Sequence, residues 1–117
     1  MLDTLVGAPA KERDPDIVYR LCAMMERMSA EAAIAVQRAL ATRPDSMATA
    51  ATIHVPTAVL AASLDRGSTP VEMRELANAV PGSTFYLLQE MGHYAPYEQP
   101  RLVGALLRRF VEQSSLH

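Results

Sequence analysis

The sequence predicts an α/β fold, an incomplete doubly wound parallel sheet in which a βαβα unit over residues 53–113 follows two helices. Two short apolar runs, at 53–62 and 84–88, are typical of strands, and apolar residues at helical spacing lie between them. A strongly amphipathic helical pattern begins at Pro100, after the second run. Two further helical patterns occupy residues 14–43, ahead of the first strand.

The composition limits the chain to one core, because 117 residues, of which 50% are hydrophobic, are too few for two comfortable cores. Its 11 Lys and Arg and 13 Asp and Glu are scattered rather than gathered in a stripe. We therefore expect neither nucleic acid nor a membrane as a partner. The chain has no apolar run near the roughly 20 residues that span a bilayer, and its N-terminus lacks the pattern of a secretory signal, so we expect a cytoplasmic protein.

Cysteine and histidine usage gives no sign of a structural metal or cofactor. Cys22 is the single cysteine, which excludes an intrachain disulfide, and we expect it to be an inert buried thiol. The histidines at positions 54, 93 and 117 do not have the spacing of metal ligands. We expect no metal and no cofactor.

The chain divides into an N-terminal stub with two helices over residues 1–46 and a C-terminal α/β core segment over residues 47–117. The apolar stub Met1–Val6 is a candidate for the end of a third strand. Asp14 and Pro15 predict a helix start, since an N-cap acceptor is followed by a residue without an amide hydrogen. Apolar residues then recur at helical spacing, at Ile17, Val18, Leu21, Met24, Met25 and Met28.

The three methionines of this stripe have two interpretations. Flexible thioethers can line a pocket for variable apolar groups, but at this spacing methionine more commonly fills a core, and we favour core filling. Ser29 is predicted to cap a second, alanine-rich helix. That helix should end before Pro44, because the residue that precedes proline disfavours the helical conformation.

The core segment has the pattern of a βαβ unit. Residues 53–62 are typical of a strand buried on both faces of a parallel sheet, and His54, at its amino end, is predicted to be a surface residue. Residues 69–72 form a capping box with proline at the first helical position, and Pro81-Gly82 ends that helix. Because the second strand follows at 84–88, the two strands should be parallel, with a right-handed crossover.

Asp65 and His93 follow these two strands on successive loops. Neighbouring parallel strands lie roughly 4.8 Å apart, so the loops at their carboxyl ends should also be neighbours. An aspartate that accepts a hydrogen bond from one ring nitrogen of a histidine leaves the opposite nitrogen free to deprotonate a nucleophile. The order acid then histidine matches the last two members of the triad in hydrolases built on α/β sheets.

Several short motifs carry a family resemblance: Val55-Pro56-Thr57, Asp65, Thr69-Pro70, Pro81-Gly82, Gly92-His93 and Glu98-Gln99-Pro100. Together they resemble the C-terminal part of the α/β-hydrolase superfamily and are similar to its small esterases, enol-lactonases and cofactor-free haloperoxidase-like members. The resemblance covers residues 53–113, and residues 14–46 match more loosely as the lid-type helices that such enzymes insert before the acid strand. It implies hydrolysis of a small apolar ester or lactone, with Asp65 as the triad acid and His93 as the triad base.

The sequence departs from the family in two places. Ala62 stands where the family often has glycine three residues before the acid, a small change that tightens the turn. The second departure is serious, since the sequence contains no G-x-S-x-G nucleophile elbow. Ser63, Ser68 and Ser83 do not lie in glycine-flanked strand-to-helix turns, so none of them is expected to be the nucleophile.

These observations leave three hypotheses. The leading one is a C-terminal fragment of an ester- or lactone-type hydrolase that supplies the acid and the histidine, is inactive alone, and needs the missing N-terminal half or a second copy as its partner. The second is a non-catalytic interaction or self-associating module, because two strands leave an apolar sheet edge unpaired. The third is a complete small enzyme that uses Asp65 and His93 alone as an acid/base pair.

Overall fold

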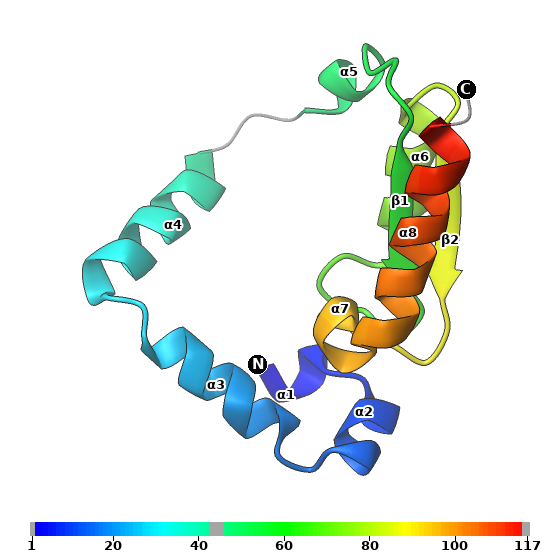
Figure 1. The fold of residues 1–117 in the computed structure, drawn as a ribbon. Helices are drawn as coiled ribbons and strands as arrows, with labels where there is room; N and C mark the ends of the chain where they lie inside the picture. The colour runs from blue at the N-terminus through cyan, green and yellow to red at the C-terminus, as the bar shows by residue number, and fades with distance from the viewer. Residues whose placement is uncertain (1, 43–45, 116–117) are drawn as a thin grey trace.

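The computed structural model describes residues 2–42 and 46–115 (Figure 1). The elements in chain order are α1 (Leu2–Leu5), α2 (Ala8–Arg13), α3 (Ile17–Glu26), α4 (Ala30–Thr42), α5 (Met47–Ala50), β1 (Ala58–Ala62), α6 (Pro70–Ala79), β2 (Thr84–Leu88), α7 (Ala95–Glu98) and α8 (Pro100–Ser115).

The sheet is parallel, as the sequence predicts, and pairs β1 with β2 in a register that runs from Ala58 opposite Thr84 to Ala62 opposite Leu88. Figure 1 shows α6 and α8 on opposite faces of these strands. Successive side chains of a strand point to opposite faces, and Leu60 and Ala62 pack in one cluster with Val103 of α8. This arrangement is an incomplete α/β unit with one helix on each face of its sheet.

Local sequence chemistry explains where α6 begins and ends. The Thr69 hydroxyl accepts a hydrogen bond from the backbone N–H of Glu72 at 3.3 Å and donates one to the Glu72 carboxylate at 3.0 Å. Gly82, three residues past the end of α6, has a φ of 71°, a conformation that costs glycine little. These two signals place the Asp65 loop before the helix and the start of β2 after it.

A second apolar cluster joins the N-terminal elements to the segment that follows β2. Its buried members are Val6, Ala10, Ile17 and Leu21, and Tyr94 and Tyr97 pack against them. The N-terminal elements therefore lie beside the carboxyl end of the sheet, which is the end that carries Asp65 and His93.

Several expectations for the N-terminal half are wrong. The stub predicted as the end of a third strand forms the helix α1 instead, because four apolar-rich residues fit either structure and neighbouring contacts decide between them. Asp14 follows the last residue of α2 and accepts hydrogen bonds from Arg20, while α3 begins only at Ile17. Residues 53–57 precede β1 as irregular chain, since the strand begins at Ala58.

Other expectations are confirmed or corrected in part. Ser29 caps α4 by accepting from the N–H of Ala32 at 3.0 Å, and His54 is exposed. Cys22 is half-buried rather than fully buried. The polar joint before α5 lies largely at 43–45, outside the described residues.

The methionine stripe does not fill a core in this structure. Met24, Met25 and Met28 are all exposed, and α4 contains no buried residue. The start of α3 packs in the second apolar cluster through Ile17 and Leu21, whereas its last turn and α4 lead away from the sheet in Figure 1, and the apolar side chains there are exposed.

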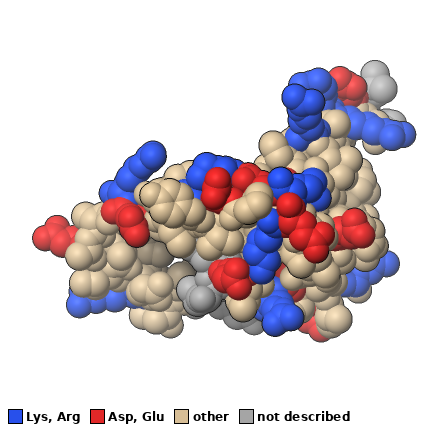
Figure 2. All heavy atoms as spheres, turned by 90° about the horizontal axis from the view of Figure 1, so that it is seen from below, with Lys and Arg blue, Asp and Glu red and all other residues tan. Residues whose placement is uncertain are grey.

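Charged side chains are dispersed over the surface. Figure 2 shows acidic and basic side chains next to one another across the middle of the face seen there. Within the described part of the chain, no helix is long and apolar enough to cross a membrane.

Candidate active site

The Asp65 loop and the His93 loop are joined by backbone hydrogen bonds directly after the two strands end. The N–H of Ser63 donates to the carbonyl of Leu88 at 2.9 Å, and the N–H of Leu64 donates to the carbonyl of Met91 at 2.8 Å. These bonds continue the pairing of β1 and β2 beyond the sheet. They hold the two loops at a fixed separation, so the side chains that follow can meet.

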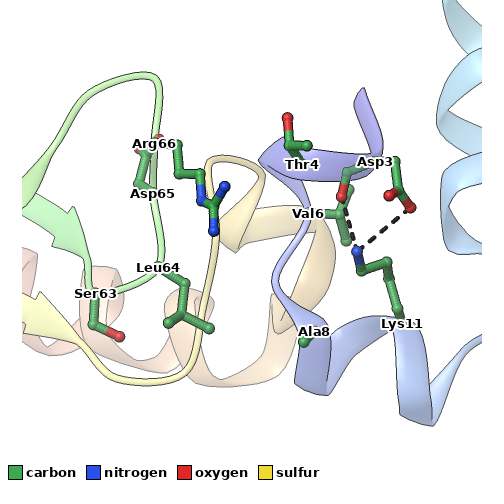
Figure 3. A pocket seen from close by; sticks show the side chains of 9 residues that line it. All are labelled: Asp3, Thr4, Val6, Ala8, Lys11, Ser63, Leu64, Asp65 and Arg66. Atoms are coloured by element: carbon green, nitrogen blue, oxygen red, sulfur yellow. Dashed lines mark hydrogen bonds and ion pairs between the residues drawn. The ribbon is translucent and has the colours of Figure 1, made fainter. Parts of the chain in front are cut away.

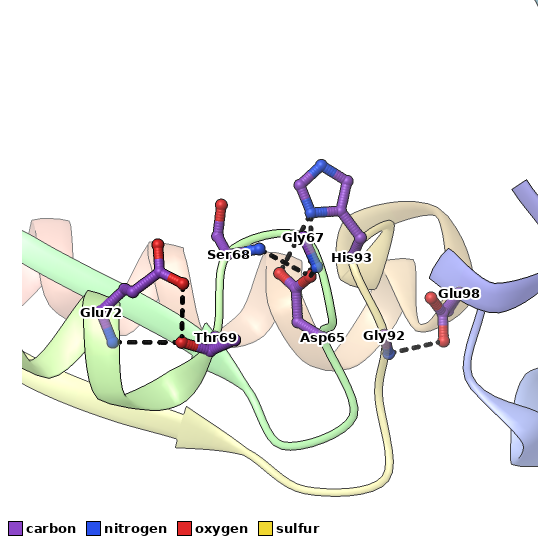
Figure 4. A network of polar contacts seen from close by, with 8 residues as sticks. All are labelled: Asp65, Gly67, Ser68, Thr69, Glu72, Gly92, His93 and Glu98. Atoms are coloured by element: carbon purple, nitrogen blue, oxygen red, sulfur yellow. Dashed lines mark hydrogen bonds and ion pairs between the residues drawn. The ribbon is translucent and has the colours of Figure 1, made fainter. Parts of the chain in front are cut away.

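The Asp65 carboxylate is held in place by its own loop. Its Oδ1 atom accepts hydrogen bonds from the backbone N–H groups of Gly67 at 2.8 Å and Ser68 at 3.1 Å (Figure 4). The Asp65 side chain is only 9% exposed. Two backbone donors and low exposure leave the carboxylate little rotational freedom, so its orientation toward the second loop is set before any substrate arrives.

His93 meets this carboxylate edge-on. Its Nδ1 atom lies 3.1 Å from Asp65 Oδ1 and 3.1 Å from Oδ2, within hydrogen-bond distance of both oxygens. Figure 4 shows the other ring nitrogen, Nε2, on the far side of the ring from Asp65, and the His93 side chain is 39% exposed. The structure thus brings the two predicted residues together, with Nδ1 bound to the acid and Nε2 open to an incoming group.

The backbone on both sides of His93 is also anchored. The His93 N–H donates to the carbonyl of Leu5 at 2.7 Å, and the Gly92 N–H donates to Glu98 Oε1 at 3.0 Å. A Cβ atom at Gly92 would lie 2.3 Å from the Leu5 oxygen and 2.6 Å from the Gly7 nitrogen. Only glycine allows so close an approach of the two backbones. The ring of Tyr94 then packs edge-to-face against the His93 ring, with centroids 5.3 Å apart.

A cavity of about 390 Å³ lies next to the acid loop, between that loop and the N-terminal elements (Figure 3). It is lined by Asp3, Thr4, Val6, Ala8, Lys11, Ser63, Leu64, Asp65 and Arg66. The Lys11 ammonium is already occupied, since it donates to the Asp3 carbonyl at 2.9 Å and lies 3.4 Å from the Asp3 carboxylate. Asp65 therefore lines this cavity, whereas His93 does not.

The hydroxyls of Ser63 and Ser83 are hydrogen-bonded to groups other than His93. Ser63 Oγ accepts from the Glu90 N–H at 2.9 Å. Ser83 precedes β2, at the opposite end of the sheet from the two loops, and its Oγ donates to the Ala77 carbonyl at 2.6 Å. Over residues 2–42 and 46–115, no serine hydroxyl is hydrogen-bonded to His93. The described residues likewise contain no group of three His, Cys, Asp or Glu side chains that could hold a metal ion.

Solved structures resemble this chain closely in fold. A thermophilic esterase from Thermogutta terrifontis superposes with a TM-score of 0.92 at 28% identity, over 97% of this chain and 42% of the esterase. An N-acyl homoserine lactone degrading enzyme, Est816, gives a TM-score of 0.79 at 25% identity, over 93% of this chain and 44% of that protein. The enol-lactonase from Burkholderia xenovorans LB400 shares the fold at a TM-score of 0.77 and 24% identity, over 95% of this chain and 42% of its own.

The fold and the paired loops define a part of an α/β-hydrolase. Within that superfamily the chain is similar to small esterases and enol-lactonases, and it spans less than half the length of the solved structures it matches. No family model matches the sequence, and no curated protein matches it either.

One residue of the site could not be assigned a role from the sequence. Glu98 belongs to a motif that marks the resemblance, yet nothing in the sequence spacing indicates that its side chain is buried against residue 7. The one hint in the sequence was that Glu98 follows four uncharged residues, Tyr94 to Tyr97, and is the single charged side chain of that segment.

Proposed function

We propose that this chain is the acid- and base-bearing part of an α/β-hydrolase that cleaves a small apolar ester or lactone. The observation that carries the proposal is the contact between Asp65 and His93 Nδ1, made by loops at the carboxyl ends of two parallel strands. Two of the solved structures that resemble this chain are an esterase and a lactone-degrading enzyme, which supports this reaction class. The roles proposed for individual residues are inferred from the geometry of this chain and not from the activities of those proteins.

The two residues have distinct tasks in the proposed reaction. Asp65 accepts the Nδ1–H of His93, which keeps the Nε2 lone pair available and stabilises the imidazolium that forms. His93 Nε2 takes the proton of a serine hydroxyl as the serine oxygen attacks the acyl carbon, and then gives that proton to the departing alkoxide. Water repeats the sequence, releasing the carboxylic acid and restoring the serine.

The serine must come from outside this chain, because the sequence contains no G-x-S-x-G elbow. We therefore propose that the catalytic unit forms with a polypeptide that carries a strand, that elbow and an oxyanion hole. The proposal predicts no ester hydrolysis by the 117-residue chain alone. It also predicts hydrolysis once the complementary part is joined to it.

A chimera tests this proposal. The 117-residue chain is fused behind the part of the Thermogutta terrifontis esterase that it does not cover, and hydrolysis of p-nitrophenyl butyrate is measured. We expect turnover that falls by about 10⁴-fold in Asp65→Asn, by analogy with the same change in a serine hydrolase triad. His93→Gln should be at least as severe, whereas His54→Gln, an exposed histidine at the opposite end of β1, should retain activity.

Two results would overturn the proposal. A folded chimera, checked by near-UV circular dichroism, that is inactive would show that the chain does not complete the enzyme. An active chimera that is indifferent to His93→Gln would show that another group is the base.

A second candidate function, a non-catalytic or self-associating module, is favoured by one observation. Apolar side chains are exposed on α3, on α4 and between these helices, at Met24, Met25, Met28, Ile34, Val36 and Leu40. Such a surface is typical of a protein contact. Light scattering of the isolated chain distinguishes a self-associating chain from a monomer. A chain that stays monomeric over a wide range of protein concentration would count against self-association.

A further inference from the structure

Glu98 is a buried carboxylate that the proposed reaction does not use. It ends α7, its exposed fraction is 8%, and it is the one charged residue buried in the described part of the chain. Carboxylates are rarely buried without partners, because removal from water disfavours the charge. The contacts of Glu98 therefore identify what keeps it there.

Both of its recorded donors are backbone amides from other segments. Glu98 Oε1 accepts from the Gly7 N–H at 3.2 Å and from the Gly92 N–H at 3.0 Å, while Oε2 has no hydrogen-bond partner. Gly7 lies between α1 and α2, and Gly92 immediately precedes His93. One oxygen thus ties the N-terminal segment, the histidine loop and α7 together.

The same three segments meet at the histidine backbone. The His93 N–H donates to the Leu5 carbonyl at 2.7 Å, and a Cβ atom at Gly92 would lie 2.6 Å from the Gly7 nitrogen, so residues 5–7 lie against the loop at both Gly92 and His93. A Cβ atom at Gly7 would lie 2.9 Å from Glu98 Oε1, and one at Gly92 would lie 3.0 Å from Oε2. The carboxylate fits a space that two glycines leave open.

We propose that Glu98 is a positioning residue that fixes the backbone of His93 so that Nδ1 stays on Asp65. Glu98 does not touch the reacting atoms. It acts through the Gly92 amide and through the N-terminal segment that it docks on the loop. The importance of this alignment rests on the proposed function of His93 as the base, but the alignment itself is measurable without any hydrolysis.

The test follows the protonated ring nitrogen of His93 by ¹⁵N NMR of the complete chain at a pH where the ring is neutral. Because Asp65 accepts from Nδ1–H, the Nδ1–H tautomer should dominate in the wild type. Asp65→Asn should lower the ratio of Nδ1–H to Nε2–H by about tenfold, the equivalent of one hydrogen bond to a charged group. Glu98→Ala should lower that ratio by at least about threefold, by loosening the same bond.

Two further variants separate positioning from packing. Glu98→Gln keeps an oxygen that can accept from both amides, so it should retain most of the wild-type ratio. Glu75→Ala, on the exposed surface of α6, should leave the ratio unchanged. If Glu98→Ala keeps the wild-type ratio while circular dichroism shows an intact fold, the proposal is wrong.

A measurement on the wild type covers the case in which Glu98→Ala fails to fold. The Gly7 and Gly92 amides should exchange with deuterium far more slowly than exposed loop amides, because both donate to a buried carboxylate. Fast exchange at both would overturn the inference. An Asp65→Asn protein with an unchanged tautomer would instead overturn the acid–base pair itself, whereas a response to Asp65→Asn but not to Glu98→Ala would remove only the role of Glu98.

Discussion

Gly92→Ala should destabilise the docking of the N-terminal segment on the histidine loop. The added methyl would lie 2.3 Å from the Leu5 carbonyl oxygen, and ordinary van der Waals contact begins at 3.4 Å, so the backbones must separate by about 1 Å. The two nearest atoms, the Leu5 oxygen and the Gly7 nitrogen, both belong to the backbone, so no side-chain rotation can relieve the clash. Three hydrogen bonds span this contact, one from His93 to Leu5 and two to Glu98.

The expected cost is about 3 kcal/mol, since a neutral hydrogen bond contributes about 1 kcal/mol and each bond to a charged group somewhat more, without full additivity. Urea denaturation measures this loss as a change in the free energy of unfolding. Gly104→Ala is the matched control, because it is exposed in the helix α8 with nothing within 4 Å of a new Cβ, and it should stabilise the protein by up to about 1 kcal/mol. A Gly92→Ala protein within about 0.5 kcal/mol of the wild type would refute the close backbone approach.

Three further predictions concern other parts of the chain. The hydrogen bond from Arg20 lowers the pKa of the Asp14 carboxyl in the folded protein below its ordinary value of 3.8. The pair therefore stabilises the fold above pH 3.8, and this contribution is lost as the pH falls through the lowered pKa of the folded state. The stability difference between wild type and Asp14→Asn should shrink from pH 6 to pH 2.5 in urea titrations, and a constant difference would contradict it. Thr69→Ala removes the cap of α6 and should cost about 1 kcal/mol in thermal unfolding, whereas Thr69→Ser should cost little. Glu90 has a φ of 60°, so Glu90→Gly should stabilise the protein by roughly 1 kcal/mol, and a loss of stability would show that its side chain matters more than its backbone.

The parts of the fold that local chemistry determines could be predicted from the sequence. The cap at Thr69, the turn at Gly82 and the two apolar runs each contain their own signal within a few residues, and together they imply the parallel pair. Parallel pairing then brings the loops of Asp65 and His93 together, as the order of the elements in the sequence predicts. Their contact follows from topology, while their roles in a reaction stay a prediction.

The predictions that were wrong concern features that depend on contacts between distant segments. The apolar stub became α1 because four residues carry no decisive periodicity. The stripe that includes Met24 has helical spacing whether or not anything covers it, so the pattern could not show that these side chains are exposed. The burial of Glu98 depends on Gly7, which is 91 residues away in the chain.

That last separation has a consequence for the order of folding. The bond from Gly7 to Glu98 closes a loop that contains both strands and every helix from α2 to α6. Closing so long a loop costs entropy, and the hydrogen bond offsets that cost only once the loop is closed. The local helices and the neighbouring strands should therefore assemble first, and the bond between Gly7 and Glu98 should form last. The His93 ring would then become fixed against Asp65 only in the last step of folding. Its orientation would therefore indicate whether the distant segments of the chain have docked.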